Sequence, residues 1–166
     1  AFVTWSHHMT TEYIDRFAGA ALRDRFLPEL LSGSRVGSTA LATALADKSG
    51  KEPLPITFTE STDASGASVF TINGVIPWAS NLYEDTLIVF AARNETTEER
   101  VVLAALLASD GVAVKPAGEL LALNATASGT VRFDGLELPA ENVLSRDVDF
   151  FIGQMRPRFL VLQTSF

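Results

Sequence analysis

Large apolar residues recur at helical spacing at the start of the chain. Between residues 1 and 18 they are three or four positions apart, which lines one face of a helix. Residues 19–31 continue this pattern, and Gly33 is placed to end the second helix in the left-handed conformation. Pro28 suits the first turn of a short helix. The face of the first helix is formed by Phe2, Trp5, Met9, Tyr13 and Phe17.

From Arg35 onward the pattern changes to alternation and short apolar runs. PITFTE, 55–60, alternates apolar residues with polar ones, as a half-buried strand does. SVFTING, 68–74, ends in Asn-Gly, which predicts a hairpin turn at that dipeptide. DTLIVFAAR, 85–93, is apolar on both faces and predicts a central strand. Further strands are expected in RVVLAALLA (100–108), VAVKP (112–116) and GTVRFDGLELP (129–139).

Helical character returns at Asp147. The order helix, β domain, helix predicts an α+β fold around a compact antiparallel β domain of six to eight strands. We expect three parts: the end of a helical domain over 1–33, the β domain over 34–145, and the start of a second helical domain over 146–166. In the last part the residues available for burial are Phe150, Phe151, Met155, Phe159 and Leu162.

Composition narrows the classes of protein and partner. Apolar residues make up 47% of the chain, which supports a sizeable core. The net charge of −7 and the lack of a basic patch disfavour a nucleic-acid partner. No apolar run approaches the length of about 20 residues that a membrane span needs. Cysteine is absent, so disulfides and thiolate chemistry are excluded, and we expect a cytoplasmic protein. The first and last residues suggest helix interiors, so we expect a piece of a longer protein.

Two short motifs are candidates for chemistry. His7 and His8 are neighbours on the first helix and point in different directions, so packing is favoured over a metal site. In IPWASN, Trp78, Ala79 and Ser80 place a flat aromatic, a small residue and a hydroxyl in order. A Trp in a β domain is more often core, but this order also lets a planar ligand lie against the strand with a hydroxyl at its edge.

Two longer stretches resemble one known family. INGVIPWASNLYEDTLIVFAAR (72–93) resembles the middle-domain signature of the acyl-CoA dehydrogenases, in which Ile-Asn-Gly and Trp-Ile-Thr/Ser-Asn open a strand facing the flavin. GTVRFDGLELPAENVL (129–144) resembles the closing segment of that domain. The flanking RFLPELLSGSRVGSTALA (25–42) and FFIGQMRPRFLVLQTS (150–165) are similar to the helices on either side.

This resemblance implies an antiparallel β-barrel middle domain flanked by helices, with FAD bound between the middle and C-terminal domains. It also implies a homo-oligomer, a dimer or tetramer. Trp78 would lie beside the isoalloxazine ring, the Ser80 hydroxyl near its N5 edge, and the Ala79 backbone between them. The first strand would fall at Leu41-Ala42-Thr43 and contact the pyrimidine edge, and Arg156 would lie next to the substrate.

The chain also departs from the family pattern. Where Thr-Glu-Pro-x-x-Gly-Ser-Asp should follow the first strand, LATALADKSGKEP (41–53) has only a displaced Ser49-Gly50. Met155 stands where some members place the catalytic Glu, and no catalytic residue is identified within the chain. The predicted function is FAD-dependent α,β-dehydrogenation of an acyl-CoA thioester in fatty acid metabolism, with electron-transfer flavoprotein as a partner. The alternatives are a flavin-dependent monooxygenase or oxidase of the same fold, and a non-catalytic paralogue acting as a structural or binding subunit.

Overall fold

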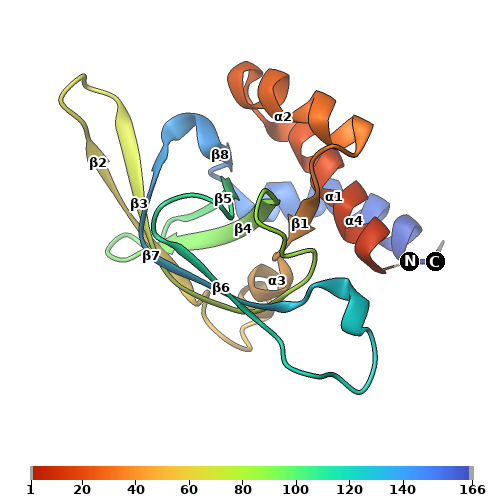
Figure 1. Ribbon diagram of the computed structural model, residues 1–166. Helices are drawn as coiled ribbons and strands as arrows, with labels where there is room; N and C mark the ends of the chain where they lie inside the picture. Colours follow the sequence, from red (N-terminus) through yellow and green to blue (C-terminus); the bar gives the residue numbers. More distant parts are fainter. Residues whose placement is uncertain (1, 165–166) are drawn as a thin grey trace.

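The computed structural model describes residues 2–164 as three long helices packed against one sheet (Figure 1). Ala1 and residues 165–166, the expected outer ends of the first and last parts, lie outside the described residues. Two of the helices come first and the third comes last, as the sequence predicted. Their bounds are α1 (Phe2–Phe17), α2 (Ala20–Ser32) and α4 (Val148–Thr164).

The sheet has eight strands, mostly antiparallel. Its order is β6-β7-β3-β2-β4-β5-β8, and β1 and β2 both pair with β4 in parallel. The strands are β1 (Gly37–Thr39), β2 (Ile56–Thr62), β3 (Ser68–Ala79), β4 (Leu87–Asn94), β5 (Arg100–Leu106), β6 (Val112–Pro116), β7 (Gly129–Pro139) and β8 (Val143–Ser145). The shorter helices are α3 (Ala42–Lys48), η1 (Asn124–Thr126) and η2 (Ala140–Asn142).

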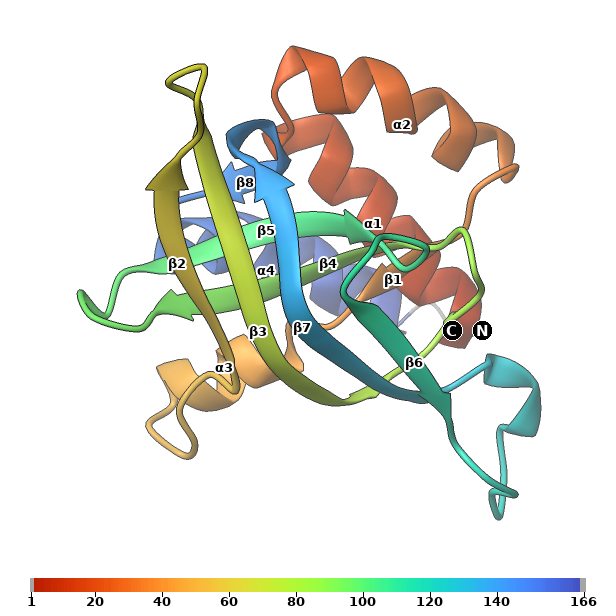
Figure 2. The same ribbon diagram turned by 60° about the vertical axis from the view of Figure 1, so that its left-hand side comes forward.

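The α+β class is therefore confirmed, but the expected closed barrel is not found. The sheet stays open within the described part of the chain, with β6 at one edge and β8 at the other (Figure 2). In this view β2, β3 and β7 run across β4 and β5, so the sheet bends strongly without closing.

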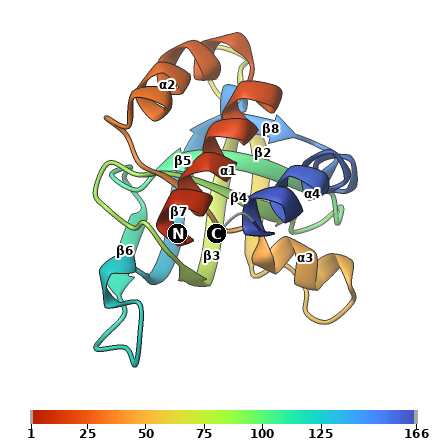
Figure 3. The same ribbon diagram turned by 90° about the vertical axis from the view of Figure 1, so that its right-hand side faces the viewer.

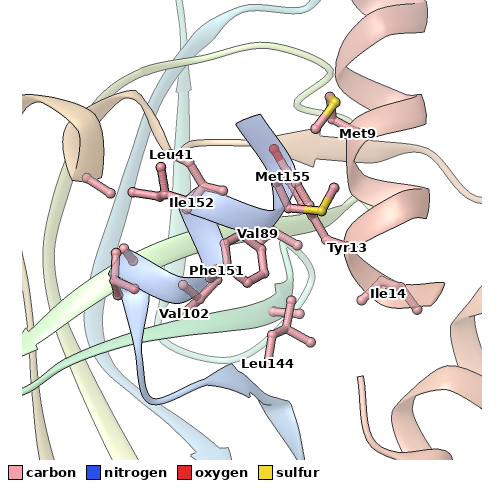
Figure 4. Packing of buried hydrophobic residues seen from close by; sticks show 14 of the residues in the cluster. Met9, Tyr13, Ile14, Leu41, Val89, Val102, Leu144, Phe151, Ile152 and Met155 are labelled. Carbon is pink, nitrogen blue, oxygen red and sulfur yellow. The ribbon is translucent and has the colours of Figure 1, made fainter. Parts of the chain in front are cut away.

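β4 is the strand that explains the apolar run in the sequence. Leu87, Val89 and Ala91 face a core shared with α1, α2 and α4, and the residues between them face a second core formed with β2, β3 and β7. Because successive strand residues point to opposite faces, a strand covered on both sides must be apolar throughout. Figure 4 shows the first core, where Val89 lies close to Phe151 of α4.

The prediction of a hairpin turn at Asn73-Gly74 is wrong, because β3 continues through this dipeptide. The β2–β3 hairpin turns earlier, between residues 62 and 68, where Asp63 accepts hydrogen bonds from Ser65 and from the Ala67 N–H. Gly74 is needed for another reason: its φ is +125°, and a Cβ there would lie 2.3 Å from the carbonyl oxygen of Pro55. The dipeptide thus marks a close backbone approach within the sheet.

Two further expectations are wrong, one about the position of the first strand and one about Pro28. The first strand is β1 at Gly37–Thr39, whereas Leu41 precedes α3 and Ala42 and Thr43 belong to it. The alanine-rich segment 42–48 has high helix propensity, so it forms α3 where the family resemblance implied a strand. Pro28 lies inside α2 and not in its first turn. Buried residues on both sides of it, Leu22, Phe26 and Leu30, hold the helix against the core despite the missing N–H.

Most of the residues expected to be buried in the last helix are buried or half-buried. Phe151 and Met155 are buried in the first core, and Phe159 and Leu162 pack against it. Phe150 is exposed, contrary to expectation, because successive helix residues point about 100° apart and the buried face of α4 is formed by Val148, Phe151, Ile152 and Met155. Among residues 2–164 no helix combines the length and apolarity that crossing a membrane requires.

Candidate functional site

A cavity of about 730 Å³ lies where α1, α4, the β1–α3 segment and the end of β3 meet. Figure 3 shows α1 and α4 on the near side of the molecule, with α3 below α4. Aromatic side chains form much of the cavity wall, and Trp5 and Phe159 meet edge to face with their ring centroids 5.0 Å apart. The aromatic residues that line it are Phe2, Trp5, Tyr13, Trp78, Phe151 and Phe159.

The structure brings nearly all the predicted site residues to this one cavity. Trp78, Ala79 and Ser80 line it from β3 and the turn after it, and Leu41 and Ala42 line it from the start of α3. Arg156 lines it from α4. The exception is Thr43, whose hydroxyl donates to the carbonyl oxygen of Ala40 at 3.3 Å and which does not line the cavity.

The end of β3 departs from the regular pairing with β7, and this places Trp78 at the cavity. The pairing of β3 with β7 shifts register between Ile76 and Ala79, so Pro77 and Trp78 lie outside the regular pairs. The Trp78 side chain is 52% exposed. The proline is tolerated because no ladder N–H is required of it at this irregularity. The local sequence thus turns a large aromatic toward the cavity and not into the core.

The turn after β3 is held by Asn81, a buried residue in the left-handed conformation with φ of 62°. Its side-chain amide donates to the carbonyl oxygens of Val3 at 2.8 Å and Gly37 at 3.0 Å, which ties the turn to α1 and β1. The Ser38 hydroxyl donates to the Ser80 carbonyl oxygen at 2.7 Å. These bonds offset the strain of the backbone and fix the direction of Ser80.

Tyr13 and Trp5 add polar atoms to the α1 side of the cavity. Burial raises the pKa of the Tyr13 hydroxyl to about 12, against a smaller opposing effect of the hydrogen bond from Thr39, whose hydroxyl lies 3.5 Å away. Tyr13 is therefore a neutral phenol at neutral pH. The indole N–H of Trp5 is buried and, among the side chains of residues 2–164, is the buried polar group that lacks a hydrogen-bond partner.

The sequence did not predict α3, which forms the wall where the family's Thr-Glu-Pro loop was expected. Leu45 and Lys48 line the cavity from this helix. Asp47 accepts hydrogen bonds from Arg100 of β5 at 2.6 and 3.3 Å, and these bonds lower the pKa of its carboxyl. Lys48 pairs with Asp149 at the start of α4. The spacing of Leu41 and Leu45 among alanines was the available signal for this helix.

The charged groups at the cavity are basic. Arg156 has no ion-pair partner within the described part of the chain, whereas its neighbour Arg158 pairs with Glu12 at 2.9 Å. Met155 is buried beside Arg156, and none of the Asp and Glu side chains between residues 2 and 164 lines the cavity. Residues 2–164 thus supply apolar walls and an unpaired guanidinium but no carboxylate base at the cavity.

His7 packs locally, as expected. Its Nε2 donates to the Leu30 carbonyl oxygen and its Nδ1 accepts from the Gly37 N–H, both at 3.1 Å, which fixes the neutral tautomer. Burial lowers the pKa of His7, and the nearby His8 lowers it further. In residues 2–164 no three His, Cys, Asp or Glu side chains come together as a metal site.

Comparison with known proteins finds similarity of structure but not of sequence. No family model matches the chain, and no curated protein sequence matches it. The fold is similar to that of a crystal structure described as an FAD-dependent dehydrogenase, with a TM-score of 0.73 at 18% identity over 97% of this chain. Butyryl-CoA dehydrogenase from Megasphaera elsdenii gives a TM-score of 0.74 at 18% identity over 93% of this chain. Glutaryl-CoA dehydrogenase from Mycobacterium smegmatis in complex with FADH2 gives 0.69 at 18% identity over 88%.

These neighbours confirm that the chain has the fold of acyl-CoA dehydrogenases, as its motifs predicted. The chain spans only about two fifths of each neighbour: 41% of the FAD-dependent dehydrogenase, 40% of the butyryl-CoA enzyme and 36% of the glutaryl-CoA enzyme. At 18% identity the similarity establishes the fold and leaves the activity to be argued from the cavity.

Proposed function

We propose that this chain forms one side of the flavin site of an FAD-dependent oxidoreductase of the acyl-CoA dehydrogenase type. One observation carries the proposal: Trp78–Ser80, Leu41–Ala42 and Arg156 are far apart in the sequence, and they line a single cavity. Short motifs that match by chance have no reason to converge in space. Their convergence, in a fold whose solved neighbours include an enzyme with bound FADH2, supports a shared flavin-binding face.

The residues present fit a flavin ring. Trp78 offers a half-exposed indole for ring packing, Ala79 leaves room for a ring to approach the backbone, and Ser80 adds a hydroxyl at the end of this row. Leu41 and Ala42 are proposed to contact the pyrimidine edge through their backbone, with Thr43 supporting that turn. When bound, the flavin would supply hydride acceptance. With flavin and substrate bound, the aromatic side chains that line the cavity would exclude water from the place where that transfer would occur.

The finer proposal is α,β-dehydrogenation of an acyl-CoA thioester. Arg156 is placed to hold a polar or anionic part of the substrate at the cavity, because its guanidinium has no competing ion pair in the described residues. The base that removes the α-proton would come from a part of the full-length protein outside this chain, since no carboxylate between residues 2 and 164 reaches the cavity. We further propose a homo-oligomer, with electron-transfer flavoprotein as the electron acceptor.

A second candidate is a flavin-dependent monooxygenase or oxidase of the same fold. The observation that favours it is α3, which fills the place of the loop that contacts flavin and acyl-CoA in the resembled family. Met155 adds to this, because it is buried where some family members carry the base.

The test begins with the full-length protein and its flavin. We expect the purified protein to be yellow, or to take up added FAD, and a panel of acyl-CoAs to bleach the flavin under anaerobic conditions. A colourless protein that takes up no FAD would refute both enzymes and favour a non-catalytic paralogue. Bound flavin that no acyl-CoA bleaches would refute the dehydrogenase and favour the second candidate.

Arg156→Gln tests the substrate role within the same experiment. We expect this variant to bind FAD as the wild type does but to need about tenfold or more acyl-CoA for half-maximal bleaching, because a hydrogen bond to a charged group is worth about 1.5–3 kcal/mol. Arg158→Gln is the matched control, since Arg158 lies two positions away on α4 and pairs with Glu12 outside the cavity. Equal effects of the two substitutions would show that Arg156 acts through the helix and not through the substrate.

A further inference from the structure

Three buried hydroxyls form a chain that starts at the cavity wall. The Ser80 and Ser128 hydroxyl oxygens are 2.6 Å apart, and those of Ser128 and Thr126 are also 2.6 Å apart. The Thr126 hydroxyl donates to the carbonyl oxygen of Leu123 at 2.8 Å. Ser80, Ser128 and Thr126 are only 4%, 8% and 7% exposed, so water competes little for these hydrogen bonds.

The hydrogen bond from Thr126 to Leu123, at the end of this row of hydroxyls, determines which oxygen donates in the other two bonds. A hydroxyl has one proton to donate, and that of Thr126 is committed to Leu123. Ser128 must therefore donate to Thr126, and Ser80 must donate to Ser128. The Ser80 proton consequently points toward Ser128, which does not line the cavity, and the remaining lone pairs of the Ser80 oxygen stay available to a group in the cavity that Ser80 lines.

The backbone around the three hydroxyls keeps this arrangement in place. The N–H groups of Asn81 and Leu82 donate to the carbonyl oxygens of Thr126 and Ala127, both at 2.9 Å. These bonds hold the turn after β3 beside the segment that leads into β7. The positions of the hydroxyls are thus set by main-chain bonds that a change of one side chain leaves intact.

We propose that Ser128 and Thr126 are positioning residues that make Ser80 a hydrogen-bond acceptor toward the flavin. This inference rests on the proposed flavin site. A reduced flavin carries a proton on N5, whereas the oxidised flavin has a lone pair there. An acceptor at Ser80 therefore favours the reduced form over the oxidised form and makes the midpoint potential of the bound flavin more positive.

Ser128→Ala tests the direction of the chain. The substitution removes the acceptor of the Ser80 proton, so that proton can turn toward the cavity and donate to oxidised N5. We expect the preference for reduced over oxidised FAD to fall by about tenfold, which is the effect of an ordinary hydrogen bond. For a two-electron couple this corresponds to a midpoint potential about 30 mV more negative. Thr126→Val removes the anchor at the other end and should shift the potential in the same direction.

Thr130→Val is the matched control. Thr130 lies on β7, two positions after Ser128, and its hydroxyl donates to the Pro77 carbonyl oxygen at 3.1 Å and takes no part in the row of Ser80, Ser128 and Thr126. The midpoint potential of FAD bound to each full-length variant is measured against a reference dye, with FAD binding measured in parallel. A shift to more negative potential in Ser128→Ala and in Thr126→Val, without a shift in Thr130→Val, supports the inference.

The outcomes separate the two proposals. A wild-type protein that binds no flavin overturns the proposed function, and this inference with it. Bound flavin whose potential is unchanged in Ser128→Ala and in Thr126→Val overturns this inference alone. A positive shift in either variant, or an equal shift in Thr130→Val, also overturns it, because the direction of the protons would then not be the cause.

Discussion

Replacing Trp78 by alanine measures how much of the proposed flavin affinity comes from one aromatic surface. The indole is 52% exposed, so the fold itself leaves about half of it for a ligand to cover. A buried Trp removes about 150–250 Å² from water, and half of that is about 100 Å². At about 25 cal/mol per Å², full cover by the ring would contribute about 2.5 kcal/mol, and cover of half that area about 1.2 kcal/mol.

These energies correspond to a loss of FAD affinity of about 60-fold and about 8-fold, respectively. The stability of the protein should change little, because exposed positions outside the core are usually worth less than about 0.5 kcal/mol. A thermal midpoint within about 2 °C of the wild type would confirm this. Trp78→Phe keeps a flat ring and should recover most of the affinity.

The assay is a titration of flavin-free protein with FAD, followed by flavin fluorescence. Trp5 and Trp78 are the two tryptophans of the chain and both line the cavity, so their emission gives a second signal. Tyr83→Ala is the matched control, because Tyr83 is 47% exposed close after β3 but does not line the cavity. Unchanged affinity in Trp78→Ala, or an equal loss in Tyr83→Ala, would refute the packing of a flavin on Trp78.

Two further predictions concern stability. At pH 8 His7→Gln should lower the thermal midpoint by several degrees, because hydrogen bonds to Leu30 and Gly37 are lost. The lowered pKa of His7 means that the wild type loses stability as pH falls below about 6.5, where the unfolded chain takes up a proton first, so the difference from the variant should narrow there. Gly74→Ala should destabilise by about 1–3 kcal/mol through the clash with Pro55, measured as a lower midpoint.

Each of these has a control in the chain. His8→Gln removes an exposed neighbour of His7 and should leave most of the pH dependence in place, because burial is the larger cause of the lowered pKa of His7 and His8 the smaller one. Gly118→Ala adds a Cβ where no atom lies within 4 Å and should leave the midpoint unchanged. A difference between His7→Gln and the wild type that stays constant from pH 8 to pH 5 would contradict the role assigned to the imidazole.

The helices and strands whose burial shows as a pattern of apolar residues could be predicted from the sequence. β4 could be predicted because a strand buried on both faces must be apolar throughout, and α1 because one face of it is buried. Asn73-Gly74 misled because its conformation is set by β7 and by the backbone at Pro55, which are distant in the sequence. The hydrogen bond from Ser80 to Ser128 joins residues 48 positions apart, and no pattern in either segment predicts it. The place of Trp78–Ser80 at a cavity could be predicted because three consecutive residues carry the pattern, and their contact with a flavin stays a prediction.

The alternation of β4 has a consequence for how this protein can change over evolution. Leu87, Val89 and Ala91 share a core with Phe151, which lines the cavity, while Ile88 and Phe90 belong to the core on the far face of the sheet. Substitutions in the first set therefore act on the cavity wall through Phe151, whereas substitutions in the second set act on it through Ala40 and Ala79, which belong to the second core and also line the cavity. A single strand thus supports the cavity wall from both of its faces, so changes at alternate residues of β4 can adjust separate parts of that wall.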